Sequence, residues 1–573
     1  LQSLGIQPHT GVALFADNSL RWLIADQGIM MAGAFNAVRS SQAETQELIS
    51  IIDNSGAKTL VVEDLKTLEK LKDSLSDLSI GLIILLSDEK NDDDLSIKLL
   101  NFNDVIALGH RHQFTPIALT KTDLATLIYT SGTSGNPKGV MLSHGNLLHQ
   151  VNTCGTVIPA PPGSRVLSIL PSWHCYERSC EYYLLSQGCT QTYTNIRYLK
   201  PDLKEYQPQY LVSVPRLLES IYEGIQKQFR EQSPQQQKLV NTCLDVSQKY
   251  IQARRIVNGL SLECPQPTLS QKLTAQLQMV VLAPLHAIAD KLVYAKIRSA
   301  TGGKIDYIIS GGGSLAKHLD LFFEIIGVNV LVGYGLTETA PITNVRRPWH
   351  NLRLSSGQPL PGTEIRIVDP ETRQTLPIGH KGLILIRGPQ VMQGYYRNPE
   401  ATAKAIDPEG WFNSGDLGMV TANNDLVITG RAKDTIVLSN GENIEPQPIE
   451  DACLRSEYIS QIVLVGQDQK YLGALIVPNL EALQQWADRQ NLPLDLEHSQ
   501  IKDLFRTELT REVKNRPGYR ADDRIAVIKP ILEPFSIENG LLTQTLKIRR
   551  PVVMERYQDM INEMFKRELG NRE

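Results

Sequence analysis

A glycine-rich loop constrains the fold of this chain more than any other feature of its sequence. From Tyr129 to Val140 it reads Tyr-Thr-Ser-Gly-Thr-Ser-Gly-Asn-Pro-Lys-Gly-Val. Glycines leave backbone N–H groups free to converge on phosphate oxygens, hydroxyl side chains add donors, and Lys138 supplies a positive charge. An apolar run over 124–129 predicts a buried strand before the loop, and Ser143 is a candidate helix cap after it. The sequence therefore predicts a loop that binds a triphosphate.

Two other interpretations of this loop are weaker. A P-loop requires Gly, four residues and then Gly-Lys-Ser/Thr. Counting from Gly132, Pro137 stands where the second glycine is required and Gly139 where Ser or Thr is required. When the loop is considered alone, an interpretation as a plain Gly/Ser linker also fits its sequence. The choice therefore depends on what else the chain contains.

Five further motifs follow the loop along the chain. They are Ser-Gly-Gly-Gly-Ser-Leu at 310–315, Gly-Tyr-Gly-Leu-Thr-Glu-Thr at 333–339, Trp-Phe-Asn-Ser-Gly-Asp at 411–416, Gly-Arg-Ala-Lys-Asp-Thr-Ile at 430–436 and Leu-Thr-Gln-Thr-Leu-Lys-Ile-Arg at 542–549. With the loop they resemble, in order, the signatures of the AMP-forming acyl-adenylate synthetases, which include acyl-CoA synthetases, luciferases and peptide-synthetase adenylation domains. The resemblance spans more than 400 residues.

Composition agrees with such an enzyme and excludes few alternatives. At 573 residues the chain exceeds one ordinary hydrophobic core, so we expect at least two domains. A net charge of −4 gives no electrostatic case for nucleic acid, while a local basic patch for an acidic protein partner stays open. The seven scattered cysteines favour a reducing compartment, and His174, Cys175 and Cys180 lack a regularly spaced fourth ligand for zinc.

The sequence contains no apolar run of the ~18 to 20 residues that a membrane span needs. The strongest candidate, over 79–86, is far too short. The chain begins Leu-Gln-Ser-Leu-Gly, without an initiator Met and without the layout of a signal peptide. We expect a cytoplasmic protein, with peripheral membrane association and a plastid location left open.

Short apolar runs that end in Gly, Pro or Ser loops predict an α/β fold. The resemblance implies a large N-terminal adenylation domain of stacked sheets and helices over residues 1–432. It also implies a small, mobile α+β lid over 433–573, with the hinge at Lys433. A Gln-rich, helix-prone segment over 231–300 is expected to be a helical insertion of the kind that long-chain members carry.

The sequence also predicts where ligands bind. A helix over 315–326, with Ser314 as its candidate cap, separates two apolar runs and forms a βαβ unit with them. The loops at 311–313 and 333–338 then open on the same edge of a sheet, where ligands usually bind. We therefore expect one nucleotide site.

Elementary chemistry indicates what these residue types can do. A carboxylate becomes a competent acyl donor once its oxygen has attacked the α-phosphorus of ATP, releasing pyrophosphate and leaving an acyl-adenylate. That step needs a metal ion and cations against the negative charge. Glu338 is a suitable Mg²⁺ ligand, Thr337 a donor to phosphate and Tyr334 a flat surface for adenine. Each also has an ordinary structural interpretation, such as packing for Tyr334 and a surface carboxylate for Glu338.

The resemblance implies the remaining roles. Asp416 and Arg431 would hold the ribose hydroxyls, and Lys547 would be the lid lysine that reaches the acyl carboxylate and the bridging phosphate oxygen. Leu546 stands where many members have Gly, and Gln544 where long-chain relatives often have Pro. The expected nucleotide-binding residues are Thr130, Ser131, Gly132, Thr133, Ser134, Gly135, Gly311, Gly312, Tyr334, Asp416 and Arg431. The expected catalytic residues are Lys138, His174, Thr337, Glu338 and Lys547.

In this family the lid rotates after pyrophosphate leaves and lets a thiol approach. Here the loop over 439–443 would face that thiol, and Gly441 would let a phosphopantetheine arm pass, although Asn440-Gly441 also reads as a hairpin turn. The acceptor would be acyl carrier protein or CoA. A basic cluster of Lys547, Arg549 and Arg550 suits either one.

The segment Leu-Pro-Ser-Trp-His-Cys-Tyr-Glu-Arg over 170–178 resembles the long-chain fatty acyl branch. His174 would border the carboxylate site. Some bacterial members have a gating tryptophan four residues after this histidine, where this chain has Arg178. With Val-Arg-Ser-Ser-Gln-Ala over 38–43, the segment is most similar to cyanobacterial and plastid acyl-acyl-carrier-protein synthetases. A long-chain acyl-CoA synthetase and a noncatalytic nucleotide- or lipid-binding protein remain alternatives.

Overall fold

A computed structural model describes residues 1–90, 96–130, 137–516, 518–543 and 546–570, with side chains up to residue 566. Within these residues the first sheet has eight strands in the order β17-β7-β6-β2-β1-β3-β4-β5. Strands β6 to β5 pair in parallel, while β7 and β17 add antiparallel edges. The strands are β1 (Gly11–Phe15), β2 (Phe35–Arg39), β3 (Thr59–Val62), β4 (Leu82–Leu85), β5 (Lys98–Leu100), β6 (Leu124–Thr130), β7 (Lys138–Ser143) and β17 (Gly394–Tyr395).

The second sheet of the described chain has seven strands in the order β14-β13-β12-β11-β10-β8-β9. Its centre is parallel, and β13 returns antiparallel to β12. The strands are β8 (Arg165–Ser168), β9 (Thr190–Tyr193), β10 (Tyr210–Ser213), β11 (Tyr307–Ser310), β12 (Asn329–Gly335), β13 (Ile342–Val345) and β14 (Gln358–Pro359). Most of these residues are buried, as the apolar runs predict.

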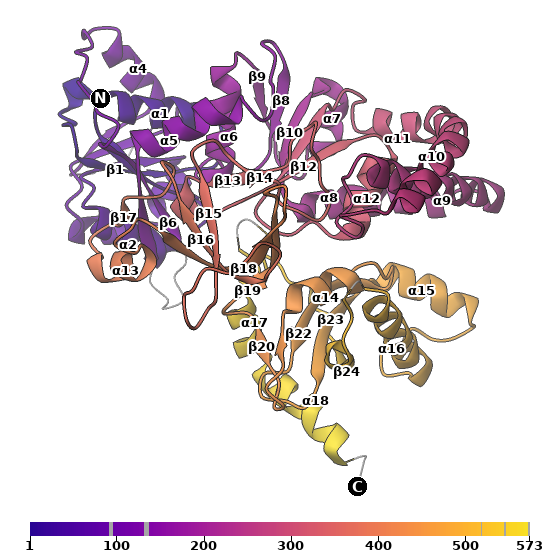
Figure 1. The fold of residues 1–573 in the computed structure, drawn as a ribbon. Helices are drawn as coiled ribbons and strands as arrows, with labels where there is room; N and C mark the ends of the chain where they lie inside the picture. Colours follow the sequence, from indigo (N-terminus) through magenta and orange to yellow (C-terminus); the bar gives the residue numbers. More distant parts are fainter. Residues whose placement is uncertain (91–95, 131–136, 517, 544–545, 571–573) are drawn as a thin grey trace.

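Two helices lie between the sheets and contribute to both cores (Figure 1). They are α5 (His144–Cys154) and α6 (Cys175–Ser186). The remaining helices of this part pack on both faces of the sheets and at their edges. They are α1 (Leu20–Met31), α2 (Thr45–Ser55), α3 (Leu65–Glu69), α4 (Phe102–Gly109), α7 (Leu199–Tyr206), α8 (Pro215–Arg230), α9 (Pro234–Val257), α10 (Leu269–Ala289), α11 (Ala295–Ala300), α12 (Lys317–Ile325) and α13 (Pro399–Ala405).

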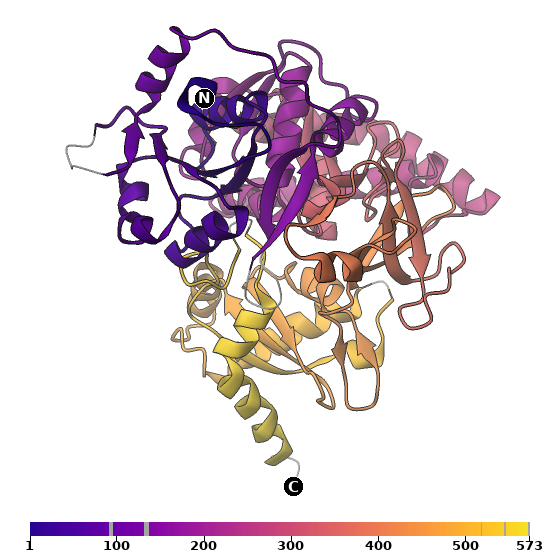
Figure 2. The same cartoon turned by 90° about the vertical axis from the view of Figure 1, so that its left-hand side faces the viewer.

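After the second sheet the chain forms a smaller antiparallel sheet and then a separate C-terminal part (Figures 1 and 2). The antiparallel sheet consists of β15 (Glu364–Val368), β16 (Gly382–Arg387), β18 (Phe412–Val420) and β19 (Leu426–Arg431). The C-terminal part has its own apolar cores on the two faces of its larger sheet. Its elements are β20 (Ile436–Val437), β21 (Asn443–Ile444), α14 (Pro446–Cys453), β22 (Ile459–Val465), β23 (Leu472–Pro478), α15 (Leu480–Arg489), α16 (Ser499–Lys514), β24 (Ile525–Pro530), α17 (Arg550–Arg556) and α18 (Gln558–Gly570).

Local predictions around the motifs had mixed outcomes. Ser143 does cap α5, because its hydroxyl accepts a hydrogen bond from the Asn146 backbone N–H. The described end of the glycine-rich motif, from Lys138 onward, forms strand β7, and α5 begins only after that strand. The predicted Ser314 cap is wrong: α12 begins after Ala316, and the Ser314 hydroxyl donates to Asp451 at 2.9 Å.

None of the helices in the described part of the chain combines the length and the apolar character needed to cross a bilayer.

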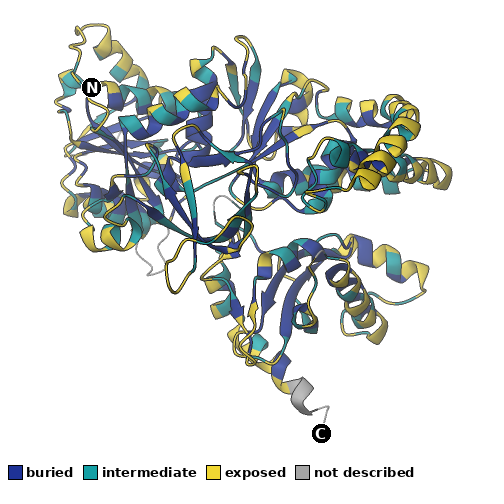
Figure 3. Ribbon diagram, viewed as in Figure 1, coloured by how far each residue is buried: buried dark blue, intermediate teal, exposed yellow. Residues whose placement is uncertain are grey.

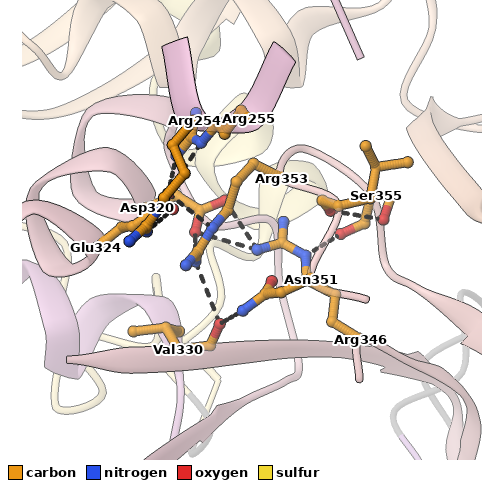
Figure 4. Close-up of polar contacts among 10 residues, drawn as sticks. Arg254, Arg255, Asp320, Glu324, Val330, Arg346, Asn351, Arg353 and Ser355 are labelled. Carbon is orange, nitrogen blue, oxygen red and sulfur yellow. Dashed lines mark hydrogen bonds and ion pairs between the residues drawn. The ribbon is translucent and has the colours of Figure 1, made fainter. Parts of the chain in front are cut away.

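A buried charge cluster fixes α12 against the second sheet (Figure 4). The Asp320 carboxylate accepts from Arg346 and Arg353 at 2.5 to 3.0 Å. Arg353 also donates to the backbone carbonyl of Val330 in β12. Burial raises the pKa of Asp320, but the two guanidinium groups outweigh it and leave this pKa at about 2. Glu324 extends the cluster to Arg254 and Arg255 of α9.

Asp320→Asn is expected to lower the free energy of unfolding by about 3 to 5 kcal/mol, because it removes the counter-charge of the buried Arg346 and leaves the buried Arg353 with Glu324 alone. Urea unfolding followed by tryptophan fluorescence measures this. Since folding lowers the pKa of Asp320, its contribution is full above about pH 4 and is lost as the pH falls through about 2. Asp503→Asn, in an exposed ion pair with Arg506, should change stability by less than about 1 kcal/mol. Equal effects of the two substitutions would contradict the assignment.

Candidate active site

A cavity of about 1070 Å³ connects the N-terminal sheets with the C-terminal part. It opens at the carboxyl ends of β11 and β12, where the loops after both strands line it. This is the convergence that the βαβ pattern predicts. Residues of the segment 537–549 line the opposite side. Ligand cavities usually measure about 300 to 1,000 Å³, so this one is at the upper end of that range.

A buried carboxylate organises the polar end of the cavity. Asp416 on β18 stands opposite Arg431 on β19 in the sheet register. The Asp416 carboxylate accepts from the Tyr334 hydroxyl at 2.6 Å and from Arg431 Nε at 3.1 Å. Burial raises the pKa of Asp416, while Arg431 and the Tyr334 hydroxyl lower it. The three side chains form one connected unit, with Tyr334 and Arg431 on the cavity wall.

A second carboxylate, that of Glu338, also lines the cavity. Glu338 lies in a 3-10 turn (Thr337–Thr339) directly after β12. Its carboxylate accepts from the Tyr395 hydroxyl at 2.9 Å. Burial raises the pKa of Glu338, and the hydrogen bond from Tyr395 opposes that rise. The ammonium of Lys138 lies 5.2 Å from the centre of the Tyr395 ring, a cation–π distance.

Lys547 reaches the cavity from the C-terminal part. Its Cε lies 3.7 Å from where a Cβ would stand on Gly312, so the side chain passes beside the glycine loop. Lys547 is a solvent-accessible residue of the cavity wall. Desolvation and the neighbouring Arg431 lower the pKa of Lys547 to about 8, although Asp416 and Glu338 oppose the shift. Lys547 therefore loses its positive charge as the pH rises through about 8.

Leu546, next to Lys547, has a positive backbone angle, φ 60°. This left-handed conformation costs a residue with a Cβ roughly 1–2 kcal/mol. It explains why a glycine suits this position in related sequences. The Leu546 side chain packs against apolar clusters of both the N-terminal and the C-terminal parts, which offsets the strain.

His174 stands at the start of α6 and lines the cavity. Its Nδ1 accepts from the backbone N–H of Tyr176 at 3.2 Å, so the ring caps the helix. Burial, with Lys547 and Arg39 nearby, lowers the pKa of His174 to about 3. The imidazole is therefore neutral at physiological pH. The neighbouring Trp173 also lines the cavity, with the Arg39 guanidinium 4.8 Å from the Trp173 ring centre.

The cavity continues from this polar end into an apolar branch between the two sheets. Gly311 lies close to the Tyr176 ring, since a Cβ on this glycine would be 2.8 Å from it. In this branch the wall is aliphatic, aromatic or thiol. The wall residues include Cys154, Val157, Ile158, Cys180, Tyr183, Leu184 and Val345.

The structure brings most of the predicted site residues together. Those on the cavity wall are Thr130, His174, Gly311, Gly312, Tyr334, Thr337, Glu338, Arg431 and Lys547. Asp416 lies behind the wall, and Lys138 turns toward Tyr395. Lys433 lies in an exposed turn after β19. The predicted loop residues Ser131, Gly132, Thr133, Ser134 and Gly135 lie outside the described residues.

The structure adds information on three side chains. Tyr395, which holds Glu338, has no motif of its own, and the sequence analysis made no prediction for it. The sequence left the role of Arg178 open, and the structure shows it fully buried in an ion pair with Asp26, away from the cavity wall. Arg550 is not available for docking, because it donates two hydrogen bonds to Glu450 at 2.6 and 2.7 Å. The predicted turn at Asn440-Gly441 is present between β20 and β21, with Gly441 at φ 84°.

Comparison with known proteins gives a consistent picture. The profile of the AMP-binding enzyme family matches residues 1–396, and that of the AMP-binding enzyme C-terminal domain matches 433–501. A probable acyl-activating enzyme 16, chloroplastic, of Arabidopsis thaliana is 43% identical over 597 residues, covering 99% of this chain and 82% of the relative. A chloroplastic long-chain-fatty-acid acyl-carrier-protein ligase of the same plant is 42% identical over 601 residues, covering 99% and 80%.

Among solved structures, the adenylation domain of a carboxylate reductase from Mycobacterium chelonae superposes with a TM-score of 0.75. The match covers 99% of this chain and 82% of that chain at 21% identity. The predicted fold class is therefore confirmed: a mixed α/β fold with a large N-terminal part and a small C-terminal part.

Proposed function

This chain belongs to the AMP-binding enzyme family, and we propose that it activates long-chain fatty acids with ATP and passes the acyl group to acyl carrier protein. The observation that carries the proposal is the two-ended cavity. Its polar end offers paired carboxylates and cations, and its apolar branch offers a wall without charges. The relative named as a long-chain-fatty-acid acyl-carrier-protein ligase supports the substrate and the acceptor.

In the first half-reaction, a carboxylate oxygen of the fatty acid attacks the α-phosphorus of ATP. The new O–P bond replaces the bond to pyrophosphate, which leaves. Lys547 and Arg431 place positive charge where the attacking oxygen and the phosphate oxygens meet. The Thr337 hydroxyl donates to phosphate, and the loop from Thr130 with Lys138 cradles the outer phosphates.

The nucleoside part of ATP fits the unit around Asp416. The Asp416 carboxylate accepts from the ribose hydroxyls, with Arg431 alongside, and the Tyr334 ring lies flat against adenine. Tyr334 and Arg431 both donate to Asp416 here, which keeps the carboxylate oriented. Gly311 and Gly312 let the nucleotide approach the backbone closely.

Mg²⁺ fits this site through Glu338. The ion prefers hard oxygen ligands and usually completes its coordination with substrate phosphates. Glu338 supplies such an oxygen on the cavity wall, with Tyr395 fixing its position through one oxygen. When bound, the ion neutralises phosphate charge. Tyr395 then acts as a positioning residue for Glu338.

The fatty acid would lie along the apolar branch with its carboxylate at the polar end. His174 borders that junction, and its neutral ring adds no charge to repel Lys547. The Cys154, Cys180 and Tyr183 side chains line the far wall. Burial of the acyl chain in an apolar branch contributes about 0.8 kcal/mol of binding free energy for each methylene group.

For the second half-reaction we divide the chain into residues 1–432 and a lid, 433–573, that rotates about Lys433. Rotation withdraws Lys547 and brings the turn at Gly441 to the cavity mouth. The thiol sulfur of phosphopantetheine then attacks the acyl carbon, and the C–O bond to AMP breaks. All seven cysteines of the enzyme are free thiols, so we place it in a reducing compartment, cytoplasmic or plastid.

The test of the proposal is product formation from palmitate and Mg-ATP with holo-acyl carrier protein or CoA as acceptor. We expect a kcat/KM for the carrier protein at least about tenfold above that for CoA, corresponding to about 1.4 kcal/mol. A preference for CoA would make the enzyme a long-chain acyl-CoA synthetase instead. Absence of any palmitate-dependent pyrophosphate release would leave only a noncatalytic binding protein.

Lys547→Ala should lower palmitate-dependent pyrophosphate release by about 10² to 10³, because a cation is removed from the developing charge. Since the pKa of Lys547 is about 8 and the charged form is required, kcat/KM of the wild type should fall as the pH rises above 8. Lys547→Arg keeps its charge, so its residual activity should lack this alkaline fall. Lys404→Ala, on an exposed helix surface, should behave as wild type. An unchanged rate for Lys547→Ala would refute its role.

Cys180→Phe should shorten the acyl branch and lower the palmitate-to-laurate ratio of kcat/KM by about tenfold or more. Cys189→Phe is the matched control, because Cys189 belongs to the same apolar cluster but not to the cavity wall. The control places an equally large side chain in the same apolar cluster but outside the branch. If both variants shift chain-length preference equally, the branch is not the acyl site.

A further inference from the structure

Arg39 places a positive charge on the cavity wall at the end of strand β2. Strands β1, β2 and β3 at the centre of the first sheet are buried (Figure 3), and within β2 only Arg39 is partly exposed. Strand β2 pairs in parallel with β6, with Val38 opposite Ile128. The next residues, Arg39 and Tyr129, are therefore neighbours at the carboxyl edge of the sheet, where ligands usually bind. Arg39 thus stands beside Thr130, where β6 ends and the glycine-rich loop begins.

Two side chains hold Arg39 without using all of its donors. Its guanidinium lies 4.8 Å from the ring centre of Trp173, a cation–π distance. Its Nε lies 2.8 Å from Oε1 of Glu47 on α2, but the geometry is that of an ion pair and not of a directed hydrogen bond. Nη1 and Nη2 form no hydrogen bond with any residue that the structure describes. These two nitrogens are therefore available to a ligand in the cavity.

The position of Arg39 selects the outer phosphates of ATP as that ligand. The Trp173 ring lies between two anion sites of the cavity, since its centre is 6.1 Å from that of His174 and 4.8 Å from the Arg39 guanidinium. His174 borders the acyl carboxylate. ATP with its ribose at Asp416 and its triphosphate on the glycine-rich loop ends near Thr130, beside Arg39. A guanidinium presents paired donors that match phosphate oxygens.

We propose that Arg39 binds the β- and γ-phosphates of ATP and the pyrophosphate that they form, and that Glu47 competes for the same guanidinium. The inference rests on the proposed function and adds a phosphate-binding residue and its competitor to it. Before ATP binds, Glu47 neutralises a partly buried cation that would otherwise be costly. After the bond to the α-phosphorus breaks, Glu47 again attracts Arg39, which weakens the hold on pyrophosphate and favours its release.

The test is palmitate-dependent exchange of pyrophosphate into ATP. In the reverse step a pyrophosphate oxygen attacks the α-phosphorus of palmitoyl-adenylate, and the P–O bond to the acyl carboxylate breaks. Arg39→Gln should raise the KM values for ATP and pyrophosphate at least about tenfold, because contacts between charged groups are lost. The KM for palmitate should change by less than about twofold, since the acyl carboxylate lies at His174.

Glu47→Gln should have the opposite effect. It removes the competitor, so a larger fraction of the protein has Arg39 ready for phosphate. The KM for pyrophosphate should fall by about threefold or more, and product inhibition by pyrophosphate should become stronger. An ion pair with a structural role alone would shift both variants in the same direction.

A second measurement starts from preformed palmitoyl-adenylate and CoA or holo-acyl carrier protein. No pyrophosphate takes part in this step, so Arg39→Gln should form the thioester at the wild-type rate, which also shows that the variant is folded. Arg39→Lys keeps the positive charge without the paired donors and should recover part of the affinity for pyrophosphate.

The matched control is Arg387→Gln. Arg387 lies 4.5 Å from the Trp411 ring centre and donates to Glu364 at 2.8 and 2.9 Å, so it repeats the arrangement of tryptophan, arginine and glutamate away from the cavity wall. It should behave as wild type. An unchanged KM for pyrophosphate in Arg39→Gln would overturn the inference, and a rise in the KM for palmitate alone would assign Arg39 to the acyl carboxylate and overturn it too. Absence of exchange in the wild type would refute the proposed function itself, and the inference with it.

Discussion

The buried ion pair of Arg178 and Asp26 is the interaction on which the architecture of the cavity depends. Both side chains are fully buried. Arg178 also donates to Thr126 of β6 and Asn36 of β2, at 2.8 and 3.1 Å, so one side of α6 is held to the first sheet. The other side of α6 packs on the second sheet and forms the wall of the acyl branch. If α6 moved, Arg178 would be left as a buried charge without its partners, at a high cost in free energy. The ion pair therefore fixes the position of α6 between the sheets.

The cavity places the cations Lys547 and Arg431 near the carboxylates of Asp416 and Glu338. Lys547 and Arg431 lie close enough for each to disfavour the other's charge, and desolvation adds to this for Lys547. Asp416 is already occupied by Tyr334 and Arg431, and Glu338 by Tyr395. The repulsion between the cations is therefore relieved best by the phosphates and carboxylate of the substrates. The attraction between these cations and the substrates therefore acts at the atoms where negative charge develops during the reaction.

The sequence could predict those parts of the site that follow from local rules. The glycine loops meet because they end neighbouring parallel strands, and Ser143 caps α5 because its side chain reaches a nearby backbone N–H. Ser314 has the sequence pattern of a helix cap, but its hydroxyl instead donates a hydrogen bond to Asp451, which is distant in the sequence. Tyr395 lies 57 residues from Glu338 and has no periodic or motif signal. Long-range pairs of this kind depend on packing, which one sequence does not reveal.

Leu546 links the two parts of the chain that share the cavity. The polar contacts between them include Ser314 with Asp451 and Lys227 with Glu481, and each part has apolar cores of its own. Leu546 holds a strained backbone angle while its side chain contacts apolar residues of both parts. A glycine here would lose that contact together with the strain. The leucine therefore stabilises the arrangement in which the adjacent Lys547 lines the cavity.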